Sequence, residues 1–124
     1  MRETFTSREL DVMTVLWDLE SGTVAEVRGK LKDKLAYTTV LTVLRTLEQK
    51  GYVRHEEDGR AHRYLPAIKR ERAGTSALKR LVDTVFKGSP ELLMTQLVSE
   101  HDLGPAELKR LRKLLEDRLR EAKP

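Results

Sequence analysis

The chain has 124 residues, of which 39% are hydrophobic and 35% charged, with a formal net charge of +4 and no cysteine. This length fits one domain, or a small domain with a helical appendage, and the lack of thiols excludes disulfides, cysteine nucleophiles and thiolate metal clusters. The longest strictly apolar runs have three residues, far short of the roughly 20 of a membrane-spanning helix, and no apolar leader follows the start. We therefore expect a cytoplasmic protein without membrane insertion.

The charge is unevenly distributed along the chain. Residues 1–27 hold two basic and six acidic side chains, whereas residues 28–63 hold nine basic and five acidic, and residues 64–124 hold 13 and nine. Phosphate attraction needs a localised basic surface, so the two basic blocks indicate a polyanionic partner more strongly than the mean charge does.

Two capping boxes predict the starts of the first two helices. In Thr6–Glu9 and in Thr23–Glu26, a threonine precedes a glutamate by three residues, a pair that satisfies free amides at a helix start. Ser21-Gly22 is expected to end the first helix. The apolar positions that we expect to face the core are Leu10, Met13, Leu16 and Trp17 in the first helix, and Val24, Val27 and Leu31 in the second.

A third helix is predicted over residues 37–50, with Gly51 as its C-terminal stop and Ala36 where a capping side chain is usual. On a helical wheel it has one apolar stripe and one threonine-rich face. The expected buried stripe is Val40, Val43, Leu44 and Leu47.

The hydrophobic period changes after this helix, and residues 52–57 and 60–65 are predicted strands on either side of Asp58-Gly59, a strong signal for a two-residue hairpin turn. With these two residues at the centre of the turn, His55 would face His62. Two imidazoles could bind a metal or sense pH. Because two ligands without a further Cys or carboxylate make a weak site, we favour an ordinary cross-strand pair and expect no metal.

Three helices followed by a hairpin within 66 residues are typical of a winged helix-turn-helix domain. We therefore expect a mainly α fold with a small β-hairpin, in which residues 1–68 form a winged-helix DNA-binding domain. Residues 69–124 are expected to form a helical dimerisation region.

Three Leu-rich helices are predicted in this second region, over about residues 69–87, 90–100 and 105–121. Such short helices make a poor core alone, and another copy of the same region would complete it, so we expect a homodimer. The last helix has a basic side that would also suit a membrane surface, but acidic residues interrupt that side. The expected dimerisation residues are Leu78, Leu81, Val85, Leu93, Leu97, Leu108, Leu111 and Leu115.

The threonine-rich face of residues 37–50 is the predicted DNA-reading surface. Short hydroxyl and methyl groups let a helix lie close to base edges in the major groove. We expect Thr38, Thr39 and Thr42 to contact base edges. Arg45 is expected to contact a base or a phosphate, and Gln49 shares the same face. The alternative is a helix whose threonine-rich side is merely solvated.

The predicted hairpin adds cations to this surface. Arg60 lies at its tip and Arg63 further along the second strand. Because a wing usually reaches phosphate or the minor groove with a long cation, we expect Arg60 to contact a phosphate, with Arg63 a weaker candidate. The acidic residues 56–58 beside the tip support the alternative that charge only keeps the hairpin soluble.

The stretch LAYTTVLTVLRTLEQKGYVRHEEDGRAHRYLP resembles the penicillinase-repressor (BlaI/MecI/CopY) family of winged-helix transcriptional repressors. The opening TSRELDVMTVLWDLESGTVAEVRGKL and the later GSPELLMTQLV fit the same family, so the resemblance covers nearly the whole chain. It implies a homodimer whose C-terminal helices interlock and whose N-terminal domains bind a palindromic operator. It also implies that Thr38, Thr39, Thr42 and Arg45 match recognition-helix positions and that Arg60 matches the wing arginine.

The resemblance also bears on how repression is relieved. In the penicillinase branch, a membrane sensor metalloprotease triggers cleavage at an Asn-Phe bond in the dimerisation region. The matching residues here are Gln96-Leu97, and the chain contains no asparagine, so this candidate cleavage position departs from the family pattern. The cysteine cluster of the copper-responsive branch is absent. The inducing signal, the regulated genes, the operator sequence and its half-site spacing are not implied.

No residue set predicts catalysis or a cofactor. The chain has no carboxylates paired around a His, Ser or Lys, no Gly-rich phosphate loop and no HExxH motif. We therefore expect a protein that is not an enzyme. The rival function is a protein-interaction module on a winged-helix scaffold, which would not bind DNA specifically.

Overall fold

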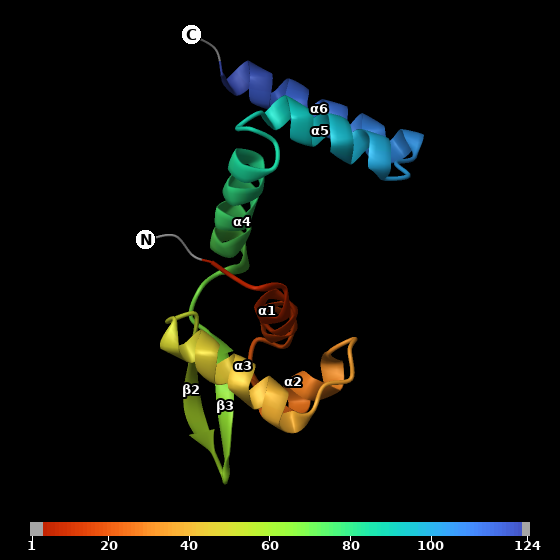
Figure 1. The fold of residues 1–124 in the computed structure, drawn as a ribbon. Helices are drawn as coiled ribbons and strands as arrows, with labels where there is room; N and C mark the ends of the chain where they lie inside the picture. The colour runs from red at the N-terminus through yellow and green to blue at the C-terminus, as the bar shows by residue number, and fades with distance from the viewer. Residues whose placement is uncertain (1–3, 123–124) are drawn as a thin grey trace. The chain divides into compact units, whose positions relative to one another are not determined.

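The computed structural model describes residues 4–122, which form six helices and three strands (Figure 1). This order confirms the predicted mainly α fold with a small β element. In chain order the elements are α1 (Ser7–Leu19), β1 (Gly22–Thr23), α2 (Val24–Lys30), α3 (Tyr37–Gln49), β2 (Val53–Asp58), β3 (Ala61–Pro66), α4 (Arg70–Thr84), α5 (Pro90–Glu100) and α6 (Pro105–Glu121).

Both predicted capping boxes are present. In α1, the Glu9 N–H donates to the Thr6 hydroxyl at 3.1 Å and the Thr6 N–H donates to the Glu9 carboxylate at 2.8 Å. In α2, Thr23 and Glu26 make the same reciprocal pair at 3.2 and 2.9 Å. These bonds satisfy amides that the helix itself leaves unpaired, so local sequence is enough to start both helices.

The sheet has a third strand that the sequence analysis missed. Strand β1 is only two residues long and pairs antiparallel with β3, which lies between β1 and β2. Gly22 leaves room for the neighbouring helices, because a Cβ at this position would lie 3.2 Å from Val27 Cγ2 on α2 and 3.3 Å from Leu19 Cδ1 on α1. Two residues are too few to show a strand period, so β1 was not predictable from the pattern.

The predicted register of the hairpin is wrong by one residue in the turn. Asp58 pairs with Ala61, so the central turn residues are Gly59 and Arg60 rather than Asp58 and Gly59. Gly59 has a φ of +65°, the sign that a type II′ turn requires at its first central residue. As a consequence, His55 faces Tyr64 and not His62.

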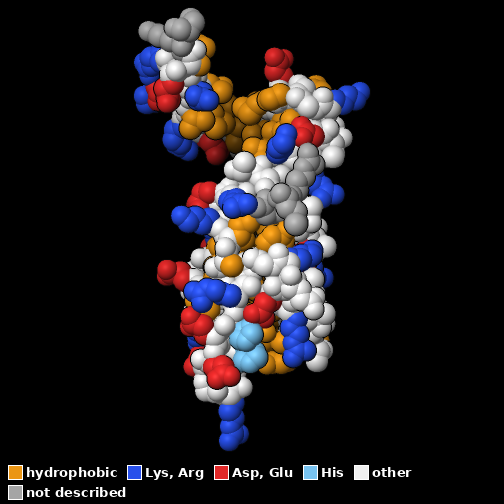
Figure 2. Space-filling model, turned by 90° about the vertical axis from the view of Figure 1, so that its left-hand side faces the viewer, with side chains coloured by type: hydrophobic (Ala, Val, Ile, Leu, Met, Phe, Trp, Pro, Cys, Tyr) orange, Lys and Arg blue, Asp and Glu red, His pale blue; other side chains and the backbone are white. Residues whose placement is uncertain are grey.

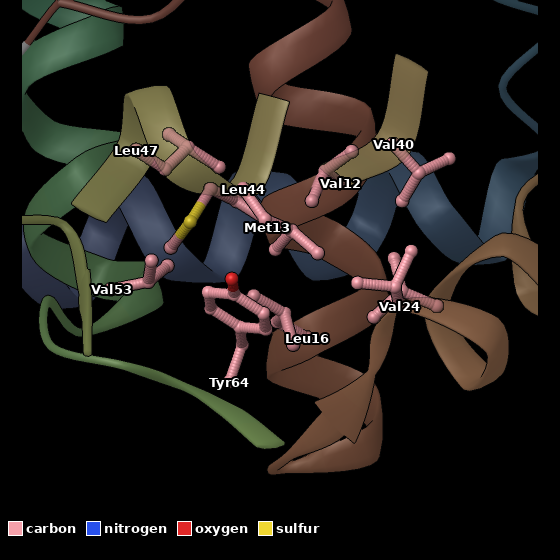
Figure 3. Packing of buried hydrophobic residues seen from close by; sticks show 10 residues of the cluster. Val12, Met13, Leu16, Val24, Val40, Leu44, Leu47, Val53 and Tyr64 are labelled. Atoms are coloured by element: carbon pink, nitrogen blue, oxygen red, sulfur yellow. The ribbon is translucent and has the colours of Figure 1, made fainter. Parts of the chain in front are cut away.

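The core of the winged-helix part brings together side chains from α1, α2, α3 and the hairpin (Figure 3). Val40, Leu44 and Leu47 of α3 are fully buried, as predicted, whereas Val43 is only partly buried. In α1, Val12 is fully buried and Leu10 is not, which corrects the predicted inward face. That face runs through Glu9, Val12, Met13 and Leu16, and a hydrophobic pattern does not include a carboxylate.

The chain divides into two compact units, Met1–Arg80 and Leu81–Pro124, with the division inside α4. The functional boundary expected after residue 68 stays a prediction. Helix α4 ends at Thr84, three residues before the predicted end, and the chain turns through Lys87 and Gly88, with φ values of +53° and +77°. The predicted bounds of α5 and α6 are confirmed. Within residues 4–122 we find no helix of the length and apolarity that crossing a bilayer requires.

Candidate nucleic-acid interface

Helix α3 presents a polar face opposite its buried stripe. Because Val40, Leu44 and Leu47 point into the core, the other side of the helix is turned outward. Thr46 on its flank is partly buried. The sequence-predicted residues that the structure brings together as exposed side chains on this face are Thr38, Thr39, Thr42, Arg45 and Gln49.

The hydroxyl groups of this face differ in what they can offer a ligand. The Thr42 hydroxyl donates to the Thr38 carbonyl oxygen at 2.9 Å, and the Thr46 hydroxyl donates to the Thr42 carbonyl oxygen at 2.9 Å. Thr42 therefore presents oxygen lone pairs and a methyl group outward. Within residues 4–122 the side chains of Thr38 and Thr39 make no hydrogen bond, so each keeps both a donor and an acceptor.

This chemistry fits base edges in a major groove. Lone pairs accept from the amino groups of adenine or cytosine, methyl groups contact the methyl of thymine, and a guanidinium such as that of Arg45 can donate twice to guanine. The side chains of the threonines are short, so the backbone of α3 could approach the bases closely.

The connection from α2 to α3 adds cations that the sequence analysis did not single out. Lys30, Lys32 and Lys34 are exposed and make no ion pair within the described residues, 4–122. The neighbouring carboxylate of Asp33 forms an ion pair with the guanidinium of Arg8 at 3.1 Å. The run of four basic residues in positions 28–34 was the available signal, and the sequence analysis counted it only as part of a basic block.

The hairpin carries one arginine in its turn and two that are paired within the fold. Arg60 is exposed and makes no ion pair in the described part of the chain. Figure 2 shows a basic side chain projecting beyond the end of the hairpin. By contrast, Arg54 pairs with Glu56 at 3.1 Å. Arg60 therefore has the geometry of a phosphate contact.

Arg63 has a different environment from the one predicted. Its guanidinium contacts Asp58 at 3.0 Å and Glu26 at 3.0 Å, and donates to the Ser21 hydroxyl at 3.3 Å. The hydrogen bonds to Asp58, and then to Glu26, raise the pKa of Arg63 above its ordinary value. Arg63 thus joins β3 to the start of α2, and two carboxylates balance its charge.

A histidine links the hairpin to α3. Nδ1 of His55 lies 2.5 Å from Oε2 of Glu48, near the end of α3. The His55 and His62 rings are stacked, with centroids 4.2 Å apart, although the two residues do not face each other in the register. Figure 2 shows the pale blue pair on the hairpin. Among residues 4–122 no group of three or more His, Asp or Glu side chains is arranged to hold a metal ion.

The second unit exposes an apolar surface. No side chain of residues 81–122 is buried, and orange side chains gather on this unit in Figure 2. On α6, Leu114, Leu115 and Leu119 are 66%, 56% and 74% exposed. Of the predicted dimerisation residues, Leu93 and Leu111 are partly buried, and the exposed ones are Leu78, Leu81, Val85, Leu97, Leu108 and Leu115.

A three-helix domain with a wing, whose last helix before the wing exposes threonine and arginine side chains, is a winged-helix DNA-binding domain. A sequence model described as "Penicillinase repressor" matches residues 5–117. The chain therefore belongs to the penicillinase repressor family.

Individual relatives agree with this assignment. The chain is 22% identical over 111 residues to the methicillin resistance regulatory protein MecI of Staphylococcus aureus. The aligned region covers 88% of this chain and 90% of MecI. It is also 46% identical over 66 residues to the transcriptional regulator BlaI of Mycobacterium tuberculosis. This aligned region covers 51% of this chain and 48% of that protein. The solution structure of Bacillus licheniformis BlaI, in monomeric form with the blaP half-operator, is 30% identical with a TM-score of 0.50, covering 57% of this chain and 89% of that one.

Proposed function

We propose that this chain is a transcriptional repressor that binds a palindromic operator as a homodimer. The observation that carries the proposal is the outward face of α3, where exposed hydroxyl, guanidinium and amide groups lie opposite a fully buried stripe. The likeness to a BlaI domain solved with a half-operator supports the same role. Because DNA is its ligand, we place the protein in the cytoplasm with the DNA it binds.

The contacts divide into two kinds. Thr38, Thr39 and Thr42 lie in the N-terminal half of α3, the part of a recognition helix that enters the groove, and they would contact base edges. Arg45 and Gln49 would contact bases or backbone further along the helix. Phosphate contacts would come from Arg60 in the wing and from the lysines between α2 and α3, with Arg63 a weaker candidate because two carboxylates hold it.

The second unit supports the homodimer. Its helices leave leucines exposed along α5 and α6, and an apolar surface of this kind on a soluble chain is typical of an interaction site. A two-fold partner with the same surface would cover it and would hold two recognition helices on a palindromic site.

Relief of repression would act on the same unit. Gln96 and Leu97 are exposed on α5. By the resemblance described above, they match the Asn-Phe bond that is cleaved in the penicillinase branch. We propose this bond as the candidate regulatory position, reached through a membrane sensor metalloprotease pathway. Incubation with such a protease and mass measurement of the products tests it, and fragments cut elsewhere would contradict it.

A binding titration tests the main proposal. The probe is the duplex upstream of the protein's own reading frame, with an unrelated duplex of equal length as the control. For roughly six to ten phosphate contacts, the affinity should fall about 10³- to 10⁵-fold between ~50 and ~200 mM salt. A protein that binds both duplexes equally, or neither, would instead fit a protein-interaction module.

A further inference from the structure

An ion pair between a buried carboxylate and a partly exposed ammonium joins the start of α1 to the end of the recognition helix α3. Glu9 is the only charged residue that is buried in the described part of the chain, residues 4–122, with 4% of its surface exposed. Lys50, the C-cap of α3, donates from Nζ to Oε1 and Oε2 of Glu9 at 3.0 and 2.9 Å. The two residues are 41 positions apart, so this contact exists only in the folded domain.

Glu9 is held in its ionised form by its surroundings. Burial raises the pKa of Glu9, but the Thr6 N–H and the Lys50 ammonium together outweigh burial, and they lower the pKa below its ordinary value of 4.5. The carboxylate that caps α1 thus also accepts the hydrogen bonds of Lys50 at the end of α3.

Stability alone is a weak reason for such a pair. Taking the Glu9 carboxylate out of water offsets much of its attraction to Lys50, and the Lys50 side chain, 35% exposed, keeps part of its hydration. The core residues that α1 and α3 share, such as Met13, Leu16 and Leu44, are apolar. Apolar contacts have no direction and tolerate sliding of one helix over another. The ion pair with its two hydrogen bonds is directional.

We propose that Glu9 and Lys50 are positioning residues, which place α3 against α1 and so determine how well the protein distinguishes its operator from other DNA. This inference rests on the proposed function. Thr42, Arg45 and Gln49 lie on the same 13-residue helix that ends beside Lys50, so a displacement at that end is transmitted to them.

Other contacts near both ends of α3 do not involve the ion pair. The Thr4 N–H donates to the Tyr52 hydroxyl at 3.0 Å, and the Phe5 and Tyr52 rings lie 4.5 Å apart. At the other end of α3, Nε of Arg28 donates to the Leu35 carbonyl oxygen at 2.7 Å. A variant without the ion pair therefore retains the core and both tethers, and its DNA binding can be measured in the folded state.

The test uses the full chain with Glu9→Gln and Lys50→Met combined. Gln keeps the capping acceptor at position 9, and Met keeps an unbranched stem at position 50 without the charge. One control is Lys50→Arg, which preserves the pair. A second control combines Asp18→Asn and Arg70→Met, which removes an exposed ion pair between α1 and α4 at 2.5 Å.

The probes are a duplex that the parent protein selects from a random-sequence pool and an unrelated duplex of the same length. Binding is measured at a temperature at which circular dichroism shows each variant folded. We expect the double variant to lose about tenfold in the ratio of the two affinities, the effect of one lost base contact, with its affinity for the unrelated duplex unchanged. Both controls should keep the parent ratio.

A folded double variant with the parent ratio would overturn the proposal, as would an equal loss of affinity for both duplexes. If the double variant does not fold, Glu9→Gln alone replaces it with the same outcomes, because it removes the carboxylate charge and keeps the cap. A parent protein that selects no sequence from the pool would overturn the proposed function itself, and this result is seen before any variant is made.

Discussion

The Thr42 hydroxyl donates its hydrogen to the Thr38 carbonyl oxygen, 2.9 Å away and one turn earlier in α3. This bond fixes the side-chain rotamer, so the lone pairs and the methyl group of Thr42 keep one orientation toward the solvent. A pre-oriented acceptor loses little entropy on binding DNA, which makes Thr42 a sharper candidate for base reading than a freely rotating hydroxyl.

Replacing Thr42 with Val keeps the branched shape and the methyl group, and puts a second methyl in place of the hydroxyl acceptor. We expect about fivefold weaker binding to the operator, equivalent to about 1 kcal/mol for one hydrogen bond, with little change for an unrelated duplex. Fluorescence anisotropy with both duplexes measures the two affinities. The matched control is Thr14→Val, because the exposed Thr14 makes the same bond to the Leu10 carbonyl oxygen at 2.8 Å on α1. Full operator preference in the Thr42 variant would contradict a base contact.

Replacing Arg60 with Ala should weaken binding to every duplex by a similar factor. A phosphate carries no sequence information, so the loss of one such contact makes the dependence of log affinity on log salt concentration less steep by about 0.9. Arg54→Ala on the same hairpin is the control, since Glu56 already neutralises that side chain. A loss confined to one base pair of the operator would show that Arg60 reads a base instead.

The stability of the winged-helix domain should fall on acidification through Glu9. Its pKa in the folded protein lies below 4.5, mainly because the Thr6 N–H and Lys50 outweigh burial. A carboxyl whose pKa is lowered by folding stabilises the fold at pH values above its pKa in the unfolded chain. This contribution is lost as the pH falls through 4.5 and below. Thermal melts from pH 7 to pH 3 should therefore show a smaller loss of Tm for Glu9→Gln than for the parent.

Glu91→Gln provides the control for this experiment, because Glu91 is an exposed carboxylate in the first turn of α5. Its melting curves should follow those of the parent over the whole range. Equal acid sensitivity of the parent and the Glu9→Gln protein would rule out the Glu9 contribution.

Introducing Leu115→Glu on α6 should dissociate the homodimer. Leu115 is 56% exposed in the single chain, and two copies would be buried in a two-fold interface. Losing about 1.5–3 kcal/mol of burial for each leucine weakens the dimer at least about a hundredfold. Sedimentation should then report a monomer, with weaker operator binding. Lys109→Glu, at an exposed polar position of α6, should leave the mass unchanged. A parent protein that sediments as a monomer would refute the dimer.

Much of the fold was predictable because its elements begin and end with local chemistry. Thr6 and Thr23 open their helices with capping boxes, and Ser89 caps α5 through the Leu92 N–H at 3.2 Å. The register of the hairpin was less predictable. Asp58-Gly59 and Gly59-Arg60 are both plausible turn centres in the sequence, and the pairing of Asp58 with Ala61 selects the second.

The candidate site was predictable as a set of residues but not as a set of contacts. The helical period places Thr38, Thr42 and Arg45 on one exposed face, and the structure has them there. The sequence pattern does not show that Arg63 is held by Glu26 and Asp58, because Glu26 is far from Arg63 along the chain. The predicted contacts with bases, phosphates and a second subunit stay predictions.

Sequence alone determined where the helices start, which face of α3 turns outward, and the family to which the chain belongs, because caps and periodicity act over a few neighbouring residues. Tertiary structure decided which charged side chains form ion pairs within the protein. Glu9 and Lys50 meet only after α1 and α3 pack together, and the two hydrogen bonds that make their pairing directional exist only in the folded domain.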